Sequence, residues 1–534
     1  MSKRLAIVFF IVIASCIFAV AGFLLMLFLA PGFSAFGLKY IRADLHVVNT
    51  GKIQISETKA FKTSGGFSGD LIIETQEVPV NIIFSQDFDF YFAYYDNFVG
   101  LTTSDFDDPS ISISKNEHGD CIIKTQEFEK FVYESSSSSR YLNIYVPLYI
   151  VGDTGATLKD LTINTKSSKV TFKKEKEDSR TASFNSVTIN TESSKVVYDS
   201  NFHAVNFNYQ TNNTIRIYGD PEKEVYATNY NLESRSGKIV INSDVVGNVT
   251  AKTNNGDISL ESCKNLYVET KCGDVGCSKE DAKVVLRGIA KITTTAGRVT
   301  LGEIKGNGDN TITTGGGAVT IDKLTDATIT TKRGAIRVKS VNSAKIKSNV
   351  GNVYVEEAIS SLDVNTQRGK MEIGGEGLTV NNPHLYSRIG RIYLKTGSGK
   401  VYVETVNSNI EFTNKDSEDI EIIGGKKVKA TRLTGIVHIK SNGDTELKFT
   451  KITNKTTIEL GDKCYSAIIN AEQNTARDTD FYLTGKYVVR YEDEAPVKKG
   501  ENGTAIDNDF VIEGDASINV SGKNAEIHVY FKKP

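Results

Sequence analysis

Short groups of carboxylates are the residues of this chain whose types and spacing first suggest chemistry. They are residues 105–109 (DFDDP) and 507–509 (DND). Clustered carboxylate oxygens can bind Ca²⁺, and a pair of carboxylates can act as acid and base in glycoside hydrolysis. Short acidic groups are more often solvated turns, which is the interpretation we favour. We therefore expect no catalytic residue, no cofactor and no metal, and a protein that is not an enzyme.

Histidine and cysteine strengthen that expectation. The six histidines are scattered, and no two have the spacing of metal ligands. Cys263, Cys272 and Cys277 lie close in sequence but lack the C-x₂₋₄-C pairs of zinc sites. We expect buried thiols, with one disulfide among these three as the alternative. No G-x-S-x-G, H-E-x-x-H or phosphate-loop motif occurs.

Basic residues form a more informative pattern. Between residues 291 and 410 the chain has sixteen Lys or Arg and ten Asp or Glu. Like charges on stacked turns repel unless an anion, salt or solvent offsets them. We hypothesise a stripe that binds a polyanion, such as an anionic envelope polymer or lipid head groups, through Arg298, Lys332, Arg333, Arg337, Arg368, Lys370, Arg388, Arg391 and Lys400. The alternative is that exposed turns have Lys and Arg merely for solubility.

Outward strand positions also include Tyr354, Tyr393 and Tyr402. Stacked tyrosine rings can bind glycans through their faces. Aromatic residues are also ordinary outward residues of sheets, and this second interpretation is preferred.

A recurring phrase positions these candidates: apolar-x-[Ile/Val]-x-[Thr/Ser]-x-x-Gly-x-[Ile/Val]-x-apolar. Examples are residues 249–260 (VTAKTNNGDISL) and 327–338 (ATITTKRGAIRV). Alternating apolar residues predict two strands, and T-x-x-G predicts the turn between them. Glycine tolerates positive φ at such a turn, and stacked Thr hydroxyls could form an internal ladder. Gly399 follows Gly390 by only half a period, so both sides of a repeat can have this turn chemistry.

The period predicts the fold class. Nine anchoring glycines from Gly237 to Gly390 follow one another at steps of 17–24 residues. We expect an all-β, single-domain parallel β-helix (β-solenoid) with about 17–20 residues per rung. An antiparallel sandwich would also alternate, but it would not require one register-locked phrase.

The N-terminus predicts a membrane anchor. Residues 5–30 are uncharged and mainly apolar, long enough to span a bilayer, and Lys3 and Arg4 precede them. The positive-inside tendency places the N-terminus in the cytoplasm and the bulk of the chain outside the cell membrane. Cleavage near residues 19–22 (AVAG) or lipidation at Cys16 are the alternatives.

Composition divides the chain into four parts. Residues 1–34 are the cytoplasmic stub and transmembrane signal-anchor, and 41–150 form an irregular β region with an acidic aromatic insertion at 81–120. Stacking could begin at Gly51, where residues 47–55 match the phrase. Residues 151–445 form the regular solenoid, and 446–534 a C-terminal β capping region.

The segments INTKSSKVTF, KTNNGDISLE, TTAGRVTLGEI and SNVGNVYVEE, which follow LNIYVPLYI, make the repeat recognisable. They resemble the bacterial family of adhesin-like domains of unknown function, which includes LiaG-like envelope proteins. The resemblance covers about residues 45–445. It implies a membrane-anchored or exported β-helix and brings no catalytic residues.

Together these observations predict a membrane-anchored, extracytoplasmic, adhesin-like binding protein of the cell surface. Its expected partners are the membrane, through the N-terminal helix, and an anionic envelope polymer or a surface protein, with no nucleic acid. One alternative is an envelope-stress accessory or scaffold that binds a neighbouring membrane protein. Another is a carbohydrate-active β-helix enzyme.

Overall fold

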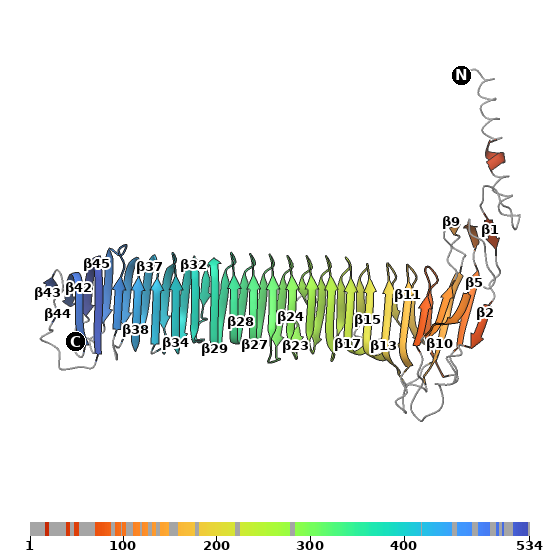
Figure 1. Cartoon of the computed structure of the whole chain (residues 1–534), viewed down its shortest axis with the longest axis horizontal. Coiled ribbons are helices and arrows are strands. Elements are labelled where there is room, and N and C mark those ends of the chain that lie inside the picture. The colour runs from red at the N-terminus through yellow and green to blue at the C-terminus, as the bar shows by residue number, and fades with distance from the viewer. Residues whose placement is uncertain are drawn as a thin grey trace, which may run out of the picture. The chain divides into compact units, whose positions relative to one another are not determined.

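The computed structural model describes residues 16–20, 39–42, 47–52, 70–86, 91–97, 99–102, 111–117, 120–125, 131–134, 139–148, 158–176, 181–218, 225–277, 283–417, 419–450, 456–471, 479–491, 498–500, 505–506 and 516–531. It is all-β, with a parallel β-solenoid of about 14 turns (Figure 1), which confirms the predicted all-β parallel solenoid. The sequence predicted a single domain, whereas the contacts separate two compact units, residues 1–234 and 235–534.

Three sequence predictions fall largely outside the described residues. Within 5–30 only residues 16–20, which are helical, are described. Across the described part of the chain, no helix has the length and apolar character needed to cross a bilayer. The anchor, its cleavage and its lipidation therefore stay predictions. The carboxylate groups at 105–109 and 507–509 also lie outside the described residues.

Unit 1 has two parallel sheets, and in each sheet the equivalent residues of neighbouring rungs lie side by side. Leu71, Leu161 and Val187 are register partners on successive strands of one sheet. That sheet comprises β8 (Cys121–Thr125), β3 (Asp70–Glu74), β11 (Leu158–Thr165), β13 (Ala182–Thr191), β15 (Phe202–Thr211) and β17 (Val225–Ser234). The other comprises β10 (Ser139–Pro147), β4 (Val80–Ser85), β12 (Val170–Lys174) and β14 (Val196–Tyr198). Parallel stacking in this unit thus includes strands before residue 150.

Antiparallel strands flank this coil in unit 1. Strand β2 (Val47–Lys52) pairs with β5 (Tyr91–Asn97), which in turn pairs with β10, in both cases antiparallel. Gly51 therefore belongs to an antiparallel pair, although its sequence matches the repeat phrase. Further antiparallel pairs join β7 (Ile111–Lys115) to β8, and β1 (Lys39–Arg42) and β9 (Phe131–Glu134) to β6 (Val99–Thr102).

An aromatic cluster fills the space between the sheets of unit 1. The rings of Phe172 and Phe202 stack with centroids 4.7 Å apart, and Phe184 meets Phe202 edge-on at 5.7 Å. Phe84 contacts all three. Such pairs stabilise beyond the burial of their area.

Unit 2 also has two parallel sheets. The first sheet comprises β19 (Asn248–Thr253), β21 (Leu266–Thr270), β24 (Ala290–Thr294), β26 (Asn310–Thr314), β32 (Pro383–Ile389), β34 (Lys400–Thr405), β36 (Asp419–Gly424), β38 (Ile436–Ser441) and β40 (Thr456–Leu460). The second comprises β18 (Ile239–Asp244), β20 (Ile258–Cys263), β22 (Val275–Gly276), β23 (Val285–Leu286), β25 (Val299–Ile304), β30 (Met371–Ile373), β31 (Val380–Asn381), β33 (Arg391–Ser398), β35 (Asn409–Asn414), β37 (Lys427–Leu433), β39 (Asp444–Phe449) and β41 (Ser466–Ala471).

Five long strands belong to both sheets, because their backbone stays extended through a bend: β27 (Val319–Thr331), β28 (Ile336–Ser348), β29 (Val353–Arg368), β42 (Thr479–Tyr491) and β45 (Ala516–Phe531). The parallel ladder also continues past residue 445. Strand β45 pairs in parallel with β40, β41 and β42 (Thr479–Tyr491). Among the described strands past residue 445, β43 (Lys498–Gly500) and β44 (Ala505–Ile506) add the antiparallel pairs, both to β42.

Along each strand of unit 2, side chains alternate between the core and the outer face. Ile258 and Leu260 of β20 are fully buried, whereas Ser259 between them faces outward. Val249 and Ala251 of β19 are buried from the facing sheet. Residues with a period of two therefore make a dry core, and chemistry is confined to outward positions and turns.

The turn from the first sheet to the second is here called the Thr–Gly corner. Its buried hydroxyl accepts a hydrogen bond from the glycine amide, at 2.9 Å between Thr294 Oγ1 and Gly297 N. Gly256, Gly273 and Gly351 make the same bond. The predicted ladder exists in part, because Ser387 Oγ accepts from Thr366 and Ser408 on neighbouring rungs at 3.3 Å. The main task of the hydroxyl is to close its own corner.

The corner glycines are required for close stacking. A Cβ built on Gly334 would overlap the carbonyl oxygen of Gly317 one rung earlier, and Gly317 meets Gly297 in the same way. Neither Gly317 nor Gly334 has a positive φ. The sequence argument from positive φ was therefore wrong for these positions, since the requirement is space between rungs.

Candidate functional site

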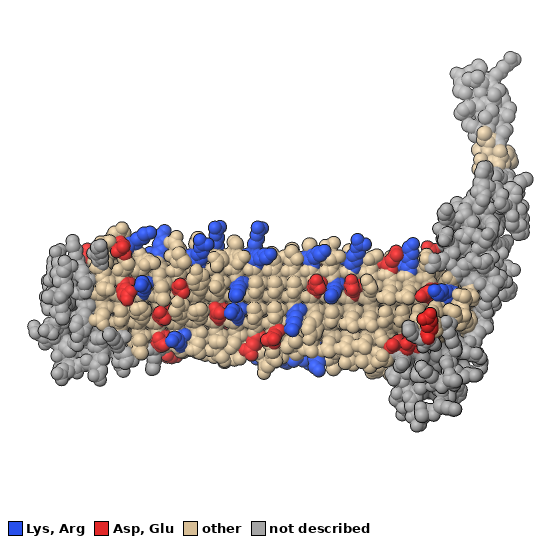
Figure 2. Space-filling model, viewed as in Figure 1, with Lys and Arg blue, Asp and Glu red and all other residues tan. Residues whose placement is uncertain are grey.

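In unit 2, two exposed residues form the tip of the Thr–Gly corner, directly before the Gly or Ser that ends the turn. On five consecutive rungs, from β27 to β34, we call these pairs the corner edge. They are exposed at every rung: Lys332 and Arg333, Asn349 and Val350, Gln367 and Arg368, Arg388 and Ile389, and Val406 and Asn407. Figure 2 shows Lys and Arg side chains projecting in a row along the upper edge of the molecule.

Backbone hydrogen bonds between neighbouring tips fix the corner edge. Val350 N donates to Lys332 O at 3.1 Å, Arg368 N to Asn349 O at 2.8 Å, and Asn407 N to Arg388 O at 3.1 Å. Rungs one β-spacing apart give the edge a length of about 19 Å over five rungs. The side chains are thus presented at a regular spacing.

The structure brings together most of the nine basic residues predicted from the sequence. Lys332, Arg333, Arg368 and Arg388 belong to the corner edge itself. Arg298, Lys370 and Arg391 come directly after a corner glycine, and Arg337 lies on the outward side of the second sheet. Lys400 is the exception, because it begins strand β34 of the first sheet and pairs with Asp419 at 3.4 Å. It lies at the opposite corner, so it does not belong to the stripe.

Of the remaining eight, three pair with an acid, Arg337 lies over the Tyr354 ring at 5.1 Å, and four have no described acidic partner. Arg298 pairs with Asp274 at 3.3 Å and Arg391 with Glu411 at 3.3 Å. Lys370 pairs with Glu372 at 2.8 Å. By contrast, no described acidic side chain pairs with Lys332, Arg333, Arg368 or Arg388, and the corner edge has no Asp or Glu. These four cations are the free part of the stripe.

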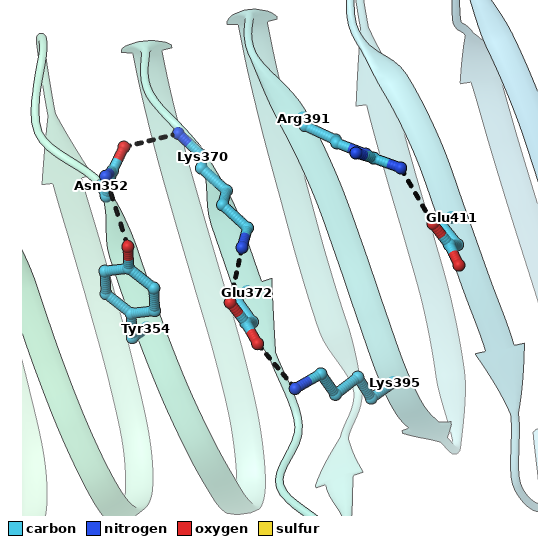
Figure 3. A network of polar contacts seen from close by, with 7 residues as sticks. All are labelled: Asn352, Tyr354, Lys370, Glu372, Arg391, Lys395 and Glu411. Carbon is cyan, nitrogen blue, oxygen red and sulfur yellow. Dashed lines mark hydrogen bonds and ion pairs between the residues drawn. The ribbon is translucent and has the colours of Figure 1, made fainter.

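Beside the edge, the outward face of the second sheet has a polar network (Figure 3). Glu372 accepts hydrogen bonds from Lys370 at 2.8 Å and from Lys395 at 2.6 Å. Lys370 and then Lys395 lower the pKa of Glu372 to about 2. Asn352 links the next rung, accepting from the Lys370 amide at 2.9 Å and donating to the Tyr354 hydroxyl at 3.3 Å. Lys370 and Lys395 therefore share one carboxylate and are not free cations.

The three outward tyrosines do not form one glycan platform. Arg337 lies over the ring of Tyr354 at 5.1 Å, and Arg391 lies over Tyr393 at 4.3 Å. Both rings therefore already have a cation on a face. Tyr402 belongs to the first sheet, where its ring stacks on His384 with centroids 4.7 Å apart.

A hollow of about 780 Å³ lies on the outward side of the first sheet. Small polar side chains are among its lining, including Thr311, Thr328 and Ser343. Lys345 and the His384–Asp363 pair, whose Nδ1 and Oδ1 atoms are 3.2 Å apart, also line it. The hollow is not predictable from local sequence because its lining comes from six rungs, and no single stretch contains it.

Cysteine and metal chemistry were predicted to be absent from the coil. The six cysteines are all free thiols, so the alternative of a disulfide among Cys263, Cys272 and Cys277 is wrong. Cys263 is buried, Cys277 is half-buried and Cys272 is exposed. Within the described ranges, no group of three or more His, Cys, Asp or Glu side chains could hold a metal ion.

Comparison with known proteins identifies the family. The model of the family described as Toastrack DUF4097, a domain of unknown function, matches residues 69–354, which is more than half of the 534 residues. The chain belongs to the Toastrack family. No curated protein and no solved structure matches the chain.

Proposed function

We propose that this member of the Toastrack family is a membrane-anchored, non-enzymatic binding protein of the cell surface, and that its solenoid holds an anionic partner along the corner edge. One observation supports this most: Lys332, Arg333, Arg368 and Arg388 project from neighbouring rungs without an acidic partner. The apolar residues 5–30, preceded by Lys3 and Arg4, support the anchor and the extracytoplasmic placement of the coil.

The attraction for anions is confined to the corner edge. The whole chain has a formal net charge of −2, so it has no general attraction for anions. On the corner edge, however, cations recur within about a Debye length of one another at physiological salt, so their potentials add. An anion bound there offsets the repulsion between them, which solvent alone offsets less completely.

Binding of the full-length protein to polyphosphate, at low and at high salt, tests this proposal. We expect binding that weakens as salt increases, and loss of binding when all four edge cations are replaced by Gln. The matched control removes four cations from the first sheet and should bind as the unchanged protein does: Lys252→Gln, Lys291→Gln, Lys345→Gln and Lys347→Gln.

Two outcomes contradict the proposal. Equal loss in the edge variant and in its control would mean that total charge, and not this edge, determines binding. Capture of a neighbouring membrane protein that is indifferent to salt and to the edge variant would favour the alternative role as an envelope scaffold.

A further inference from the structure

The corner edge exposes aliphatic side chains between its cations. Val350, Ile389 and Val406 are 53%, 44% and 58% exposed. They lie at the tips of three of the five rungs, next to Arg333, Arg368 and Arg388 along the edge. Single exposed aliphatic residues are ordinary on protein surfaces, but three on one edge within about 19 Å form a pattern.

The other exposed aliphatic residues of unit 2 are distributed differently. Val246, Ile359 and Ile436 lie near the opposite corner, several rungs from one another. Single cations without a described acidic partner do lie near them, Lys264 beside Val246 and Arg432 close to Ile436, whereas Lys400 at that corner pairs with Asp419. On the corner edge, by contrast, four cations without a described acidic partner and three exposed aliphatic residues gather within five rungs.

We propose that the corner edge docks on an anionic bilayer surface. This inference rests on the proposed function and names the partner class. A hydrated polyanion would use the cations and leave Val350, Ile389 and Val406 in water. A bilayer interface uses both kinds of residue, because head groups meet Lys and Arg while aliphatic side chains enter the boundary between head groups and acyl chains.

The geometry of the edge suits a flat surface. Backbone hydrogen bonds hold the tips at a regular spacing, so docking orders little additional chain. Cations and aliphatics alternate along one line, so each aliphatic side chain that enters the interface has a cation beside it for the head groups. Two acids beside the edge, Glu372 and Glu411, are paired with Lys370 and Arg391 and thus repel the head groups less.

Because the chain contains no Trp, one introduced Trp is a unique fluorescent probe. The full chain with Val350→Trp is reconstituted in vesicles of phosphatidylcholine alone, or of phosphatidylcholine with phosphatidylglycerol, each with brominated acyl chains as quenchers. We expect strong quenching in the anionic vesicles at low salt, and weaker quenching in neutral vesicles or at high salt. Ile359→Trp, at the opposite corner, should stay unquenched in both.

Two further variants separate this inference from the proposed function. Replacing Ile389 and Val406 by Ser in the Val350→Trp chain should abolish quenching while polyphosphate binding stays unchanged. Replacing the four edge cations by Gln should abolish both. Since all substituted positions are exposed, an unchanged denaturation midpoint confirms that each variant is folded.

Polyphosphate binding without quenching of Val350→Trp in anionic vesicles would overturn the bilayer inference and leave the polyanion function intact. Equal quenching of Val350→Trp and Ile359→Trp would also overturn it, because the edge would then have no preferred contact with lipid. Absence of polyphosphate binding by the unchanged protein would instead contradict the proposed function itself.

Discussion

A Cβ atom on Gly317 would overlap the carbonyl oxygen of Gly297, the equivalent glycine one rung earlier. At these glycines the two rungs are therefore too close to admit a Cβ atom unless the backbone moves. The same relationship repeats from Gly256 to Gly390, and it makes the corner the part of the fold most sensitive to substitution.

Gly317→Ala should destabilise the protein by about 1–3 kcal/mol or more, because the backbone must move to make room for the methyl group. Its neighbour is a matched control. A Cβ on Gly316 would meet nothing closer than 3.9 Å, so Gly316→Ala should stay within about 1 kcal/mol of the unchanged protein. Denaturant midpoints measure both, and equal midpoints would contradict the stacking argument.

Thr294→Val tests the corner hydroxyl. Valine has nearly the same shape but leaves the buried Gly297 amide without its acceptor, which should cost about 1–3 kcal/mol. Thr293→Val, on the outward side of the same strand, should change stability little. Hydrogen exchange at the Gly297 amide provides a local readout, and unchanged protection there would refute the assigned role.

Glu372→Gln should give a pH-dependent loss of stability of at most about 1 kcal/mol, since the site is near the surface. Lys370 and Lys395 lower the folded-state pKa of Glu372 to about 2 from an ordinary value of 4.5. The contribution is therefore complete above about pH 5 and is lost as pH falls toward 2. The unfolding free energies of the two proteins should become equal in acid. A difference that persists there would show that the Glu372 contacts with Lys370 and Lys395 do not cause it.

Phe202→Ala should destabilise unit 1 by about 3–5 kcal/mol, because Phe202 is fully buried and contacts Phe84, Phe172 and Phe184. Val205→Ala, in the same strand but 45% exposed, is the control and should have a small effect. Thermal unfolding measures the contrast.

Thiol labelling should distinguish the cysteines of unit 2. Burial raises the pKa of Cys263 to about 12, whereas Cys272 is exposed at a corner tip. A disulfide reagent at mildly alkaline pH should react rapidly with Cys272 and reach Cys263 only after unfolding. Cys272→Ser should remove part of the rapid phase, and Cys263→Ser should leave that phase unchanged.

Local sequence was sufficient for the rungs because each one is built from nearby residues. The alternation in residues 249–260 and the T-x-x-G turn correctly predicted β19, the corner and β20. The same reasoning failed at Gly51, whose strand β2 pairs antiparallel with β5. A short strand has the same alternation in either direction, so only its partner decides how it pairs.

Lys400 illustrates a second limit. Gly399, with φ of 68°, does occupy a turn, but this turn lies at the opposite corner from Gly390. The half-period spacing was the signal for this, and grouping Lys400 with the other basic residues disregarded it. The partners of Arg298 and Arg391 were equally inaccessible to sequence, since Asp274 and Glu411 are a full rung away along the chain.

The sequence by itself determined a parallel coil and confined its chemistry to corners and outward faces, because strand alternation and the Thr–Gly turn act over a few residues. Only the tertiary structure decided which cations remain free, which rungs expose aliphatic tips beside them, and why the corner needs glycine. These properties depend on side-by-side contacts between rungs about 20 residues apart in the chain. Spacings that vary from 17 to 24 residues leave that lateral register undetermined until the rungs are stacked.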